Sequence, residues 1–89
     1  MKNTEVKVID VRTPMEFAGG HVEGSINIPL DTFGKRVNEI LEIKEPIVLC
    51  CASGMRSFSA YQYLTEKGCT NVSDGGPWYT VADVLSEVK

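Results

Sequence analysis

The segment IVLCCASGMRS, residues 47–57, holds the residue types most suited to chemistry. Two adjacent cysteines, Cys50 and Cys51, end an apolar run, and Gly54 and Arg56 follow within a few residues. A thiolate is a strong nucleophile, and loop N–H groups or a helix N-terminus lower the pKa of a thiol beside them. This arrangement favours nucleophilic chemistry at one of the two thiols.

The three cysteines of the chain have different expected roles. Free cysteine is among the most buried residue types, so packing is the simplest interpretation for each of them. We keep that interpretation for Cys50 and for Cys69, which follows a glycine far from the loop. For Cys51 the glycine, arginine and serine that follow favour chemistry.

Strand and helix patterns alternate along the chain and should place this loop at a sheet edge. Helices expected after strands imply right-handed crossovers and a parallel sheet, whose ligands gather at the carboxyl ends of the strands. Glycine and proline positions with apolar periodicity predict strands at 5–11, 24–30, 47–50 and 70–74, and helices at 14–17, 31–41, 57–67 and 78–88. Thr13 is the expected cap of the first helix, Asp31 that of the second, and Gly75-Gly76 an expected turn.

Length and charge limit the possible function classes. The 89 residues allow one domain, spanning 1–89, and the net charge of −3 argues against nucleic-acid binding. No apolar stretch reaches the roughly 20 residues of a membrane span, and the first residues lack a signal-peptide pattern. With free thiols expected, we predict a cytoplasmic protein. The single histidine and the cysteine spacing predict neither a metal site nor a cofactor.

Four motifs occur in an order that resembles rhodanese-like domains: DVRTPMEF, GHVEGSINIP, CASGMRS and DGG. The resemblance implies an α/β fold with a central parallel sheet of four to five strands and helices on both faces. Fewer residues precede the IDVR strand than is usual in the family. The resemblance also implies a persulfide on Cys51, with substrate held by the loop residues Ala52, Ser53, Gly54, Met55, Arg56 and Ser57.

The spacing within the loop decides between the two cysteines once the family pattern is considered. Sulfurtransferases and related phosphatases of this kind place a glycine three residues after the nucleophile. Gly54 stands three residues after Cys51 and four after Cys50. The resulting small ring suits a single sulfur atom, whereas a phosphoryl group with three oxygens needs a larger cradle.

The resemblance implies a transferase that moves a sulfane sulfur from thiosulfate or a persulfide donor to a thiol or cyanide. A sulfur-carrier or interaction module that serves a partner protein, such as a disulfide reductase, is the alternative. A phosphatase-like enzyme that uses Cys50 is a third interpretation.

Other polar residues near the motifs are expected to have structural roles. Asp10 and Arg12 should form an ion pair at a strand end, and Glu16 is expected to pair with Arg12. His21 should bond nearby backbone, because a thiolate that is already ionised needs no general base. Arg56 either binds the anionic donor or braces the loop.

Overall fold

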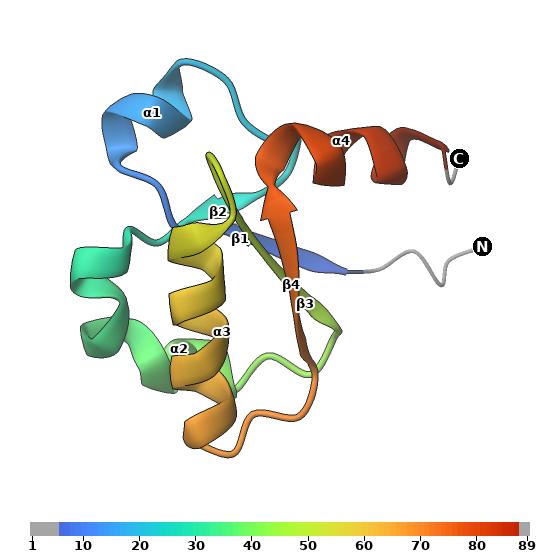
Figure 1. Ribbon diagram of the computed structural model, residues 1–89. Coiled ribbons are helices and arrows are strands. Elements are labelled where there is room, and N and C mark those ends of the chain that lie inside the picture. Colours follow the sequence, from blue (N-terminus) through green and yellow to red (C-terminus); the bar gives the residue numbers. More distant parts are fainter. Residues whose placement is uncertain (1–5, 88–89) are drawn as a thin grey trace.

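The computed structural model describes residues 6–87 and has one four-stranded parallel sheet with the strand order β2-β1-β3-β4 (Figure 1). The fold is therefore the α/β fold predicted from the sequence, at the lower of the two predicted strand numbers. The strands are β1 (Lys7–Asp10), β2 (Ile26–Asn27), β3 (Ile47–Cys51) and β4 (Val72–Pro77).

Helical segments connect these strands and follow the last one. Within residues 6–87, no helix is long and apolar enough to cross a membrane. The helical segments are α1 (Pro14–Ala18), the 3-10 helix η2 (Leu30–Arg36), α2 (Val37–Leu41), α3 (Met55–Glu66) and α4 (Trp78–Glu87).

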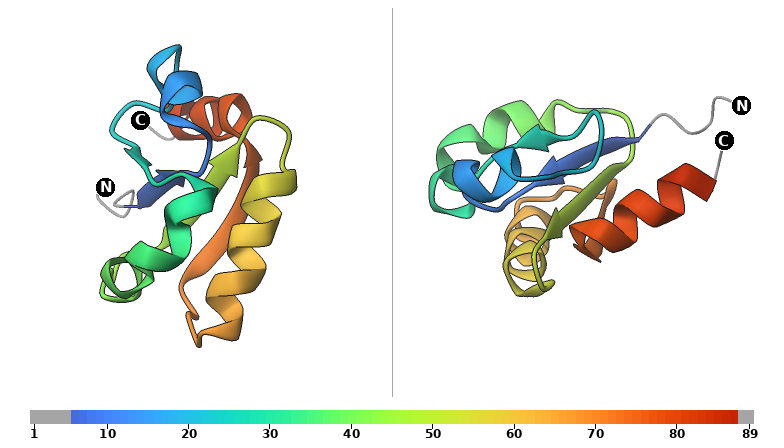
Figure 2. Two further views of the ribbon diagram at one scale, coloured as in Figure 1. Left: turned by 90° about the vertical axis from the view of Figure 1, so that its left-hand side faces the viewer. Right: turned by 90° about the horizontal axis from the view of Figure 1, so that it is seen from above.

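The sheet separates two apolar cores because successive strand side chains point to opposite faces. One core is packed under η2, α2 and α3 and includes Ile9, Leu49 and Leu64, all fully buried. The other is packed under α4 and includes Val8 and Val81. Seen from above, η2, α2 and α3 lie on one side of the strands and α4 on the other (Figure 2, right).

Two helix starts follow directly from local sequence. Thr13 caps α1 as predicted, and its hydroxyl accepts from the N–H of Glu16 while the Glu16 carboxylate accepts from the N–H of Thr13. This reciprocal pair is a capping box, with Pro14 at the first helical position. Gly54 has φ = 102°, a conformation that favours glycine, and so turns the chain from the loop directly into α3.

Two predictions for the middle of the chain were wrong in detail. The strand expected over 24–30 is reduced to Ile26–Asn27, because Pro29 ends it and Leu30 already begins η2. Asp31 does not cap this helix, since it lies inside the first turn and the cap position is Pro29.

Further corrections concern the end of the chain. Gly75 and Gly76 do not form a turn but continue β4, with a register shift against β3. Helix α3 begins at Met55 rather than Ser57, so Ser57 lies buried within its first turn. The predicted ends at residues 5 and 88 lie outside the described residues.

Candidate active site

Cys51 lies at the carboxyl end of β3, beneath the N-terminal end of α3, and its side chain is fully buried. Its sulfur accepts from the backbone N–H of Gly54 at 2.9 Å and from that of Ser57 at 3.4 Å. The thiol lies 3.5 Å from the Ser57 hydroxyl oxygen, to which it donates. The loop thus surrounds one sulfur atom with polar hydrogens.

This environment makes Cys51 more acidic than an ordinary cysteine. Burial acts to raise its pKa, but hydrogen bonds from the Ser57 side chain and the N–H groups of Ser57, Gly54 and Ser53 outweigh it, so the pKa is lowered. The start of α3 adds the positive end of the helix dipole. Cys51 therefore has the features of a nucleophilic thiolate.

Cys50 is fully buried on the opposite face of β3, in the core under α4. Burial, and next the nearby Asp10 carboxylate, raises the pKa of Cys50 to about 12. Adjacent thiols thus differ because the strand points Cys51 towards the helix terminus and Cys50 into an apolar core. Cys50 remains a protonated thiol at neutral pH.

Arg56 is held by Glu16 of α1 rather than left free in the site. Its guanidinium donates to both carboxylate oxygens, at 2.8 and 3.0 Å. The hydrogen bond from Arg56 is the largest of several influences that lower the pKa of Glu16 to about 2. Of its two predicted roles, this geometry favours bracing the loop, and it corrects the expected pairing of Glu16 with Arg12.

Asp10 and Arg12 form a buried ion pair next to the site. The Arg12 guanidinium donates to both Asp10 carboxylate oxygens at 2.8–3.0 Å and to the carbonyl of Gly20 at 2.6 Å. It also lies over the ring of Trp78, 5.0 Å from the centroid. These contacts tie β1, the loop at Gly20 and the start of α4 together.

His21 and Cys69 lie in local structural contacts. The Nδ1 of His21 bonds the carbonyl of Phe17 at 2.8 Å, and the two rings stack with centroids 3.8 Å apart. The thiol of Cys69 donates to the side-chain oxygen of Asn71 at 3.2 Å. Among residues 6–87, no group of three or more histidine, cysteine, aspartate or glutamate side chains is placed to hold a metal ion.

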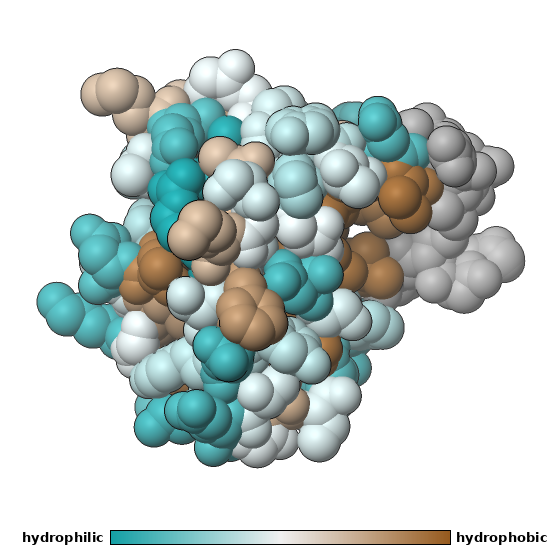
Figure 3. All heavy atoms as spheres, in the orientation of Figure 1, coloured by the Kyte–Doolittle hydropathy of each residue, from teal (hydrophilic) through white to brown (hydrophobic). Residues whose placement is uncertain are grey.

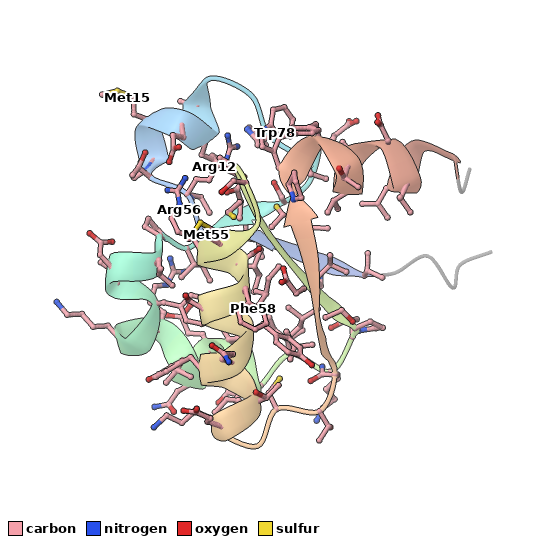
Figure 4. All side chains as sticks on the ribbon, in the orientation of Figure 1. Arg12, Met15, Met55, Arg56, Phe58 and Trp78 are labelled. Atoms are coloured by element: carbon pink, nitrogen blue, oxygen red, sulfur yellow. The ribbon has the colours of Figure 1, made fainter. Side chains whose placement is uncertain are left out.

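The remaining loop residues line the rim of the site. Ala52 is half-buried, whereas Met55 is 77% exposed at the start of α3, next to Arg56 (Figure 4). Phe58 is 49% exposed on the next part of the same helix. Apolar side chains gather over the start of α3 and over η2 on this face (Figure 3). Exposed apolar side chains therefore flank the site next to the charged pair of Arg56 and Glu16.

A surface pocket of about 330 Å³ adjoins the loop through Arg56. Its other walls come from the segments that follow β1 and β2, at the carboxyl edge of the sheet, and include Val11, Thr13, Leu30 and Asp31. This is the edge at which parallel sheets bind ligands.

Sequence reasoning assigned no site role to Asp74 and paired Glu16 with the wrong arginine. Asp74 accepts from the Ser57 hydroxyl at 2.7 Å, so it lies one hydrogen bond from the Cys51 environment. The sequence feature that could have indicated this role is a carboxylate at the end of a predicted strand, directly before two glycines. For Glu16, the capping-box spacing from Thr13 fixes the side chain at the helix start, where it faces Arg56.

Comparison with known proteins finds relatives that match about three quarters of the chain. The chain is 46% identical over 68 residues to the uncharacterized protein YqhL of Bacillus subtilis, covering 76% of this chain and 53% of YqhL. It is 38% identical over 69 residues to the thiosulfate sulfurtransferase PspE of Escherichia coli, covering 76% of this chain and 66% of PspE. The chain thus spans about half to two thirds of these relatives.

The structure and the family pattern agree with this similarity. A solved structure described as rhodanese with anions from E. coli superposes with a TM-score of 0.78 at 33% identity, covering 86% of this chain and 92% of that one. The sequence pattern of the rhodanese-like domain matches residues 1–76. The protein belongs to the rhodanese-like domain family.

Proposed function

We propose that the protein is a sulfurtransferase that carries a sulfane sulfur as a persulfide on Cys51. The observation that carries this proposal is the contrast between the two adjacent thiols. Cys51 receives N–H donors at the start of α3 and has a lowered pKa, whereas Cys50 has a raised one. Relatives named sulfurtransferase support the assignment.

In the first step, the Cys51 thiolate attacks the outer sulfur of thiosulfate. The new sulfur–sulfur bond forms as the bond to the sulfonate sulfur breaks, and sulfite leaves with the electron pair. The charge of the persulfide then lies on its outer sulfur. The N–H groups of Gly54 and Ser57, which bond the Cys51 sulfur, and the positive end of the α3 dipole lie beside this anion and stabilise its charge.

In the second step, a thiolate or cyanide attacks the outer sulfur of the persulfide. The bond between the two sulfur atoms breaks, and Cys51 returns to a thiolate while the acceptor leaves as a persulfide or thiocyanate. Both steps follow the logic of thiol–disulfide exchange, in which a more acidic thiol is the better leaving group. A lowered pKa of Cys51 therefore favours release of the sulfur.

A phosphatase-like reaction at Cys50 has less support. Cys50 lies in the core under α4, and burial raises its pKa to about 12. A phosphoryl group also needs donors for three oxygens and room for the leaving group. The loop hydrogen bonds converge instead on the single sulfur of Cys51.

The second candidate function is a sulfur carrier that serves a partner protein, and exposed apolar side chains beside the site favour it. Met15 on α1 is 85% exposed and Met55 is 77% exposed, and flexible methionines suit adaptable contacts with a partner protein. In that role Cys51 receives sulfur from a protein persulfide, and thiosulfate is a poor donor.

Two assays on one preparation test the proposal. We expect thiocyanate formation from thiosulfate and cyanide, together with negligible hydrolysis of an aryl phosphate. Phosphate release without thiocyanate would contradict the assignment. If neither reaction occurs but a persulfidated partner protein transfers its sulfur to Cys51, the carrier role replaces the thiosulfate reaction.

A further inference from the structure

The hydroxyl of Ser57 lies between two groups that compete for its hydrogen. Its oxygen is 3.5 Å from the Cys51 sulfur and 2.7 Å from a carboxylate oxygen of Asp74. The carbonyl of Gly54 lies 3.1 Å away as a weaker acceptor. A serine hydroxyl has one hydrogen to donate, so it cannot serve the thiolate and the carboxylate fully at once.

An irregularity in β4 accompanies this placement of Asp74. Asp74 pairs with Leu49, but the next residue of β3, Cys50, pairs with Gly76, so Gly75 is an extra residue in β4. Such bulges redirect side chains next to active sites. The N–H of Gly76 donates to the same Asp74 oxygen at 3.1 Å and holds the carboxylate in place.

We propose that Asp74 is a positioning residue that competes with the Cys51 sulfur for the single hydroxyl hydrogen of Ser57. The benefit of this competition for catalysis rests on the proposed function, but the contacts that create it involve no substrate. The aspartate of the DGG motif would then control how strongly Ser57 hydrogen-bonds to the Cys51 thiolate.

The hydroxyl has a different preferred partner in each state of the nucleophile. With a neutral thiol, Cys51 donates to the Ser57 oxygen and Ser57 donates to Asp74. When the thiol proton has passed to water, the Ser57 hydrogen turns towards the thiolate. In the persulfide the charge moves to the outer sulfur, and the hydrogen returns to Asp74. These turns move no proton between residues.

The competition limits how far the loop acidifies Cys51. A carboxylate that attracts the Ser57 hydrogen weakens its hydrogen bond to the thiolate, and its negative charge opposes a second one nearby. Because intrinsic nucleophilicity falls as the pKa of a thiol falls, Asp74 would keep the Cys51 thiolate reactive as a nucleophile while the loop keeps it a good leaving group.

Other titratable groups around the site are mostly paired with each other. Arg56 interacts electrostatically with Cys51 from α3 and is bound by Glu16 of α1. Cys50 faces the opposite core, and its pKa is influenced by Asp10, the last residue of β1, and by Arg12, which follows that strand. The substitutions below leave all of these groups in place.

The test is the pH profile of Cys51 alkylation by iodoacetamide, followed by mass spectrometry of the Cys51 peptide. Asp74→Asn keeps an oxygen that can accept from Ser57 and Gly76 but removes the charge. We expect its alkylation midpoint to fall by about half a unit to one unit of pH, and that of Ser57→Ala to rise by about as much. Ser73→Ala, on the neighbouring strand position, is the matched control and should leave the midpoint unchanged.

The double variant separates competition through Ser57 from simple charge repulsion. If Asp74 acts through the hydroxyl, Asp74→Asn should have a much smaller effect in the Ser57→Ala protein. An equal shift in both backgrounds, no shift, or an upward shift with Asp74→Asn would overturn the proposal. If Ser57→Ala does not fold, Asp74→Ala must lower the midpoint further than Asp74→Asn does, because alanine also removes the oxygen that accepts from Ser57, and an equal shift would overturn the proposal. Alkylation requires no sulfur donor, so these results are independent of whether the protein transfers sulfur.

Discussion

The pKa values of the neighbouring thiols Cys50 and Cys51 are shifted in opposite directions, because a strand points successive side chains to opposite faces. Cys51 faces the start of α3 and receives polar hydrogens, whereas Cys50 faces valines under α4. One residue along the strand therefore separates a thiol whose pKa is lowered by hydrogen bonds from one whose pKa is raised by burial.

This difference predicts the outcome of cysteine substitutions. Cys51→Ser should abolish sulfur transfer, because a serine hydroxyl forms no persulfide. Cys50→Ser and Cys69→Ala should retain most of the activity per folded molecule, although both alter buried positions. Thiocyanate formation and circular dichroism of the three variants provide the measurements. An inactive Cys50→Ser with an active Cys51→Ser would show that the wrong thiol has been chosen.

At the scale of elements, the ion pair between Glu16 and Arg56 joins α1 to the first turn of α3. The pKa of Glu16 is about 2 in the folded protein, compared with 4.5 for an unperturbed carboxyl. The pair therefore contributes its full stabilisation above pH 4.5, and this contribution is lost as the pH falls towards 2.

Glu16→Gln should lower the melting temperature at pH 7, and the difference from the wild type should shrink as the pH falls below 4.5. Glutamine retains the capping interaction with Thr13, so the comparison isolates the charge. Glu39→Gln is the control, since Glu39 pairs with Arg36 within one exposed segment. A Glu16→Gln difference that stays constant from pH 7 to pH 3 would contradict this account.

Gly75 is required by packing between β4, β3 and α4. A Cβ at this position would lie 2.6 Å from a methyl of Val81 and 2.7 Å from one of Val48. Gly75→Ala should therefore destabilise the fold by ~1–3 kcal/mol, measured by urea denaturation. Gly19→Ala is the control, because its Cβ would lie 3.5 Å from the carbonyl oxygen of Glu16, an ordinary contact distance. Equal stability of the two variants would argue against this tight packing.

The order of elements and the position of the loop could be predicted from the sequence. The continuous apolar run over 47–50 and the Thr13-Pro14 start signal are local features, and both correspond to observed elements. The bulge at Gly75 was mistaken for a turn, because consecutive glycines permit either structure and only pairing with β3 decides between them.

The partners of charged side chains were less predictable. Glu16 was expected to bond Arg12, four residues away in the sequence, but it bonds Arg56, forty residues away. Arg12 instead donates to Asp10 and to the carbonyl of Gly20. The partner of a charged side chain depends on which segments lie together at the sheet edge, and the local spacing of residues does not determine this.

At the scale of the whole molecule, the carboxyl edge of the sheet brings together segments from across the chain. Arg12 follows β1, bonds Gly20 and lies against Trp78 at the start of α4. Cys51 ends β3, one of the two inner strands, and accepts from the N–H of Ser57 in α3. Stability and site geometry should therefore be coupled.

This coupling leads us to propose that residues 1–89 fold as one cooperative domain. Fluorescence of Trp78 reports on the sheet edge, whereas far-UV circular dichroism reports on all helices. The two signals should give coincident urea transitions, as expected for a two-state domain. Transitions with clearly different midpoints would show that the edge around Trp78 unfolds separately.

The central claim is that Cys51 accepts the transferred sulfur. The most direct measurement is mass spectrometry of the intact protein after incubation with thiosulfate or a small-molecule persulfide, followed by peptide mapping. The account predicts a gain of one sulfur atom on Cys51, removed by cyanide and absent from Cys51→Ser. A sulfur atom located on Cys50 or Cys69, or a wild-type protein that gains none from either donor, would contradict it.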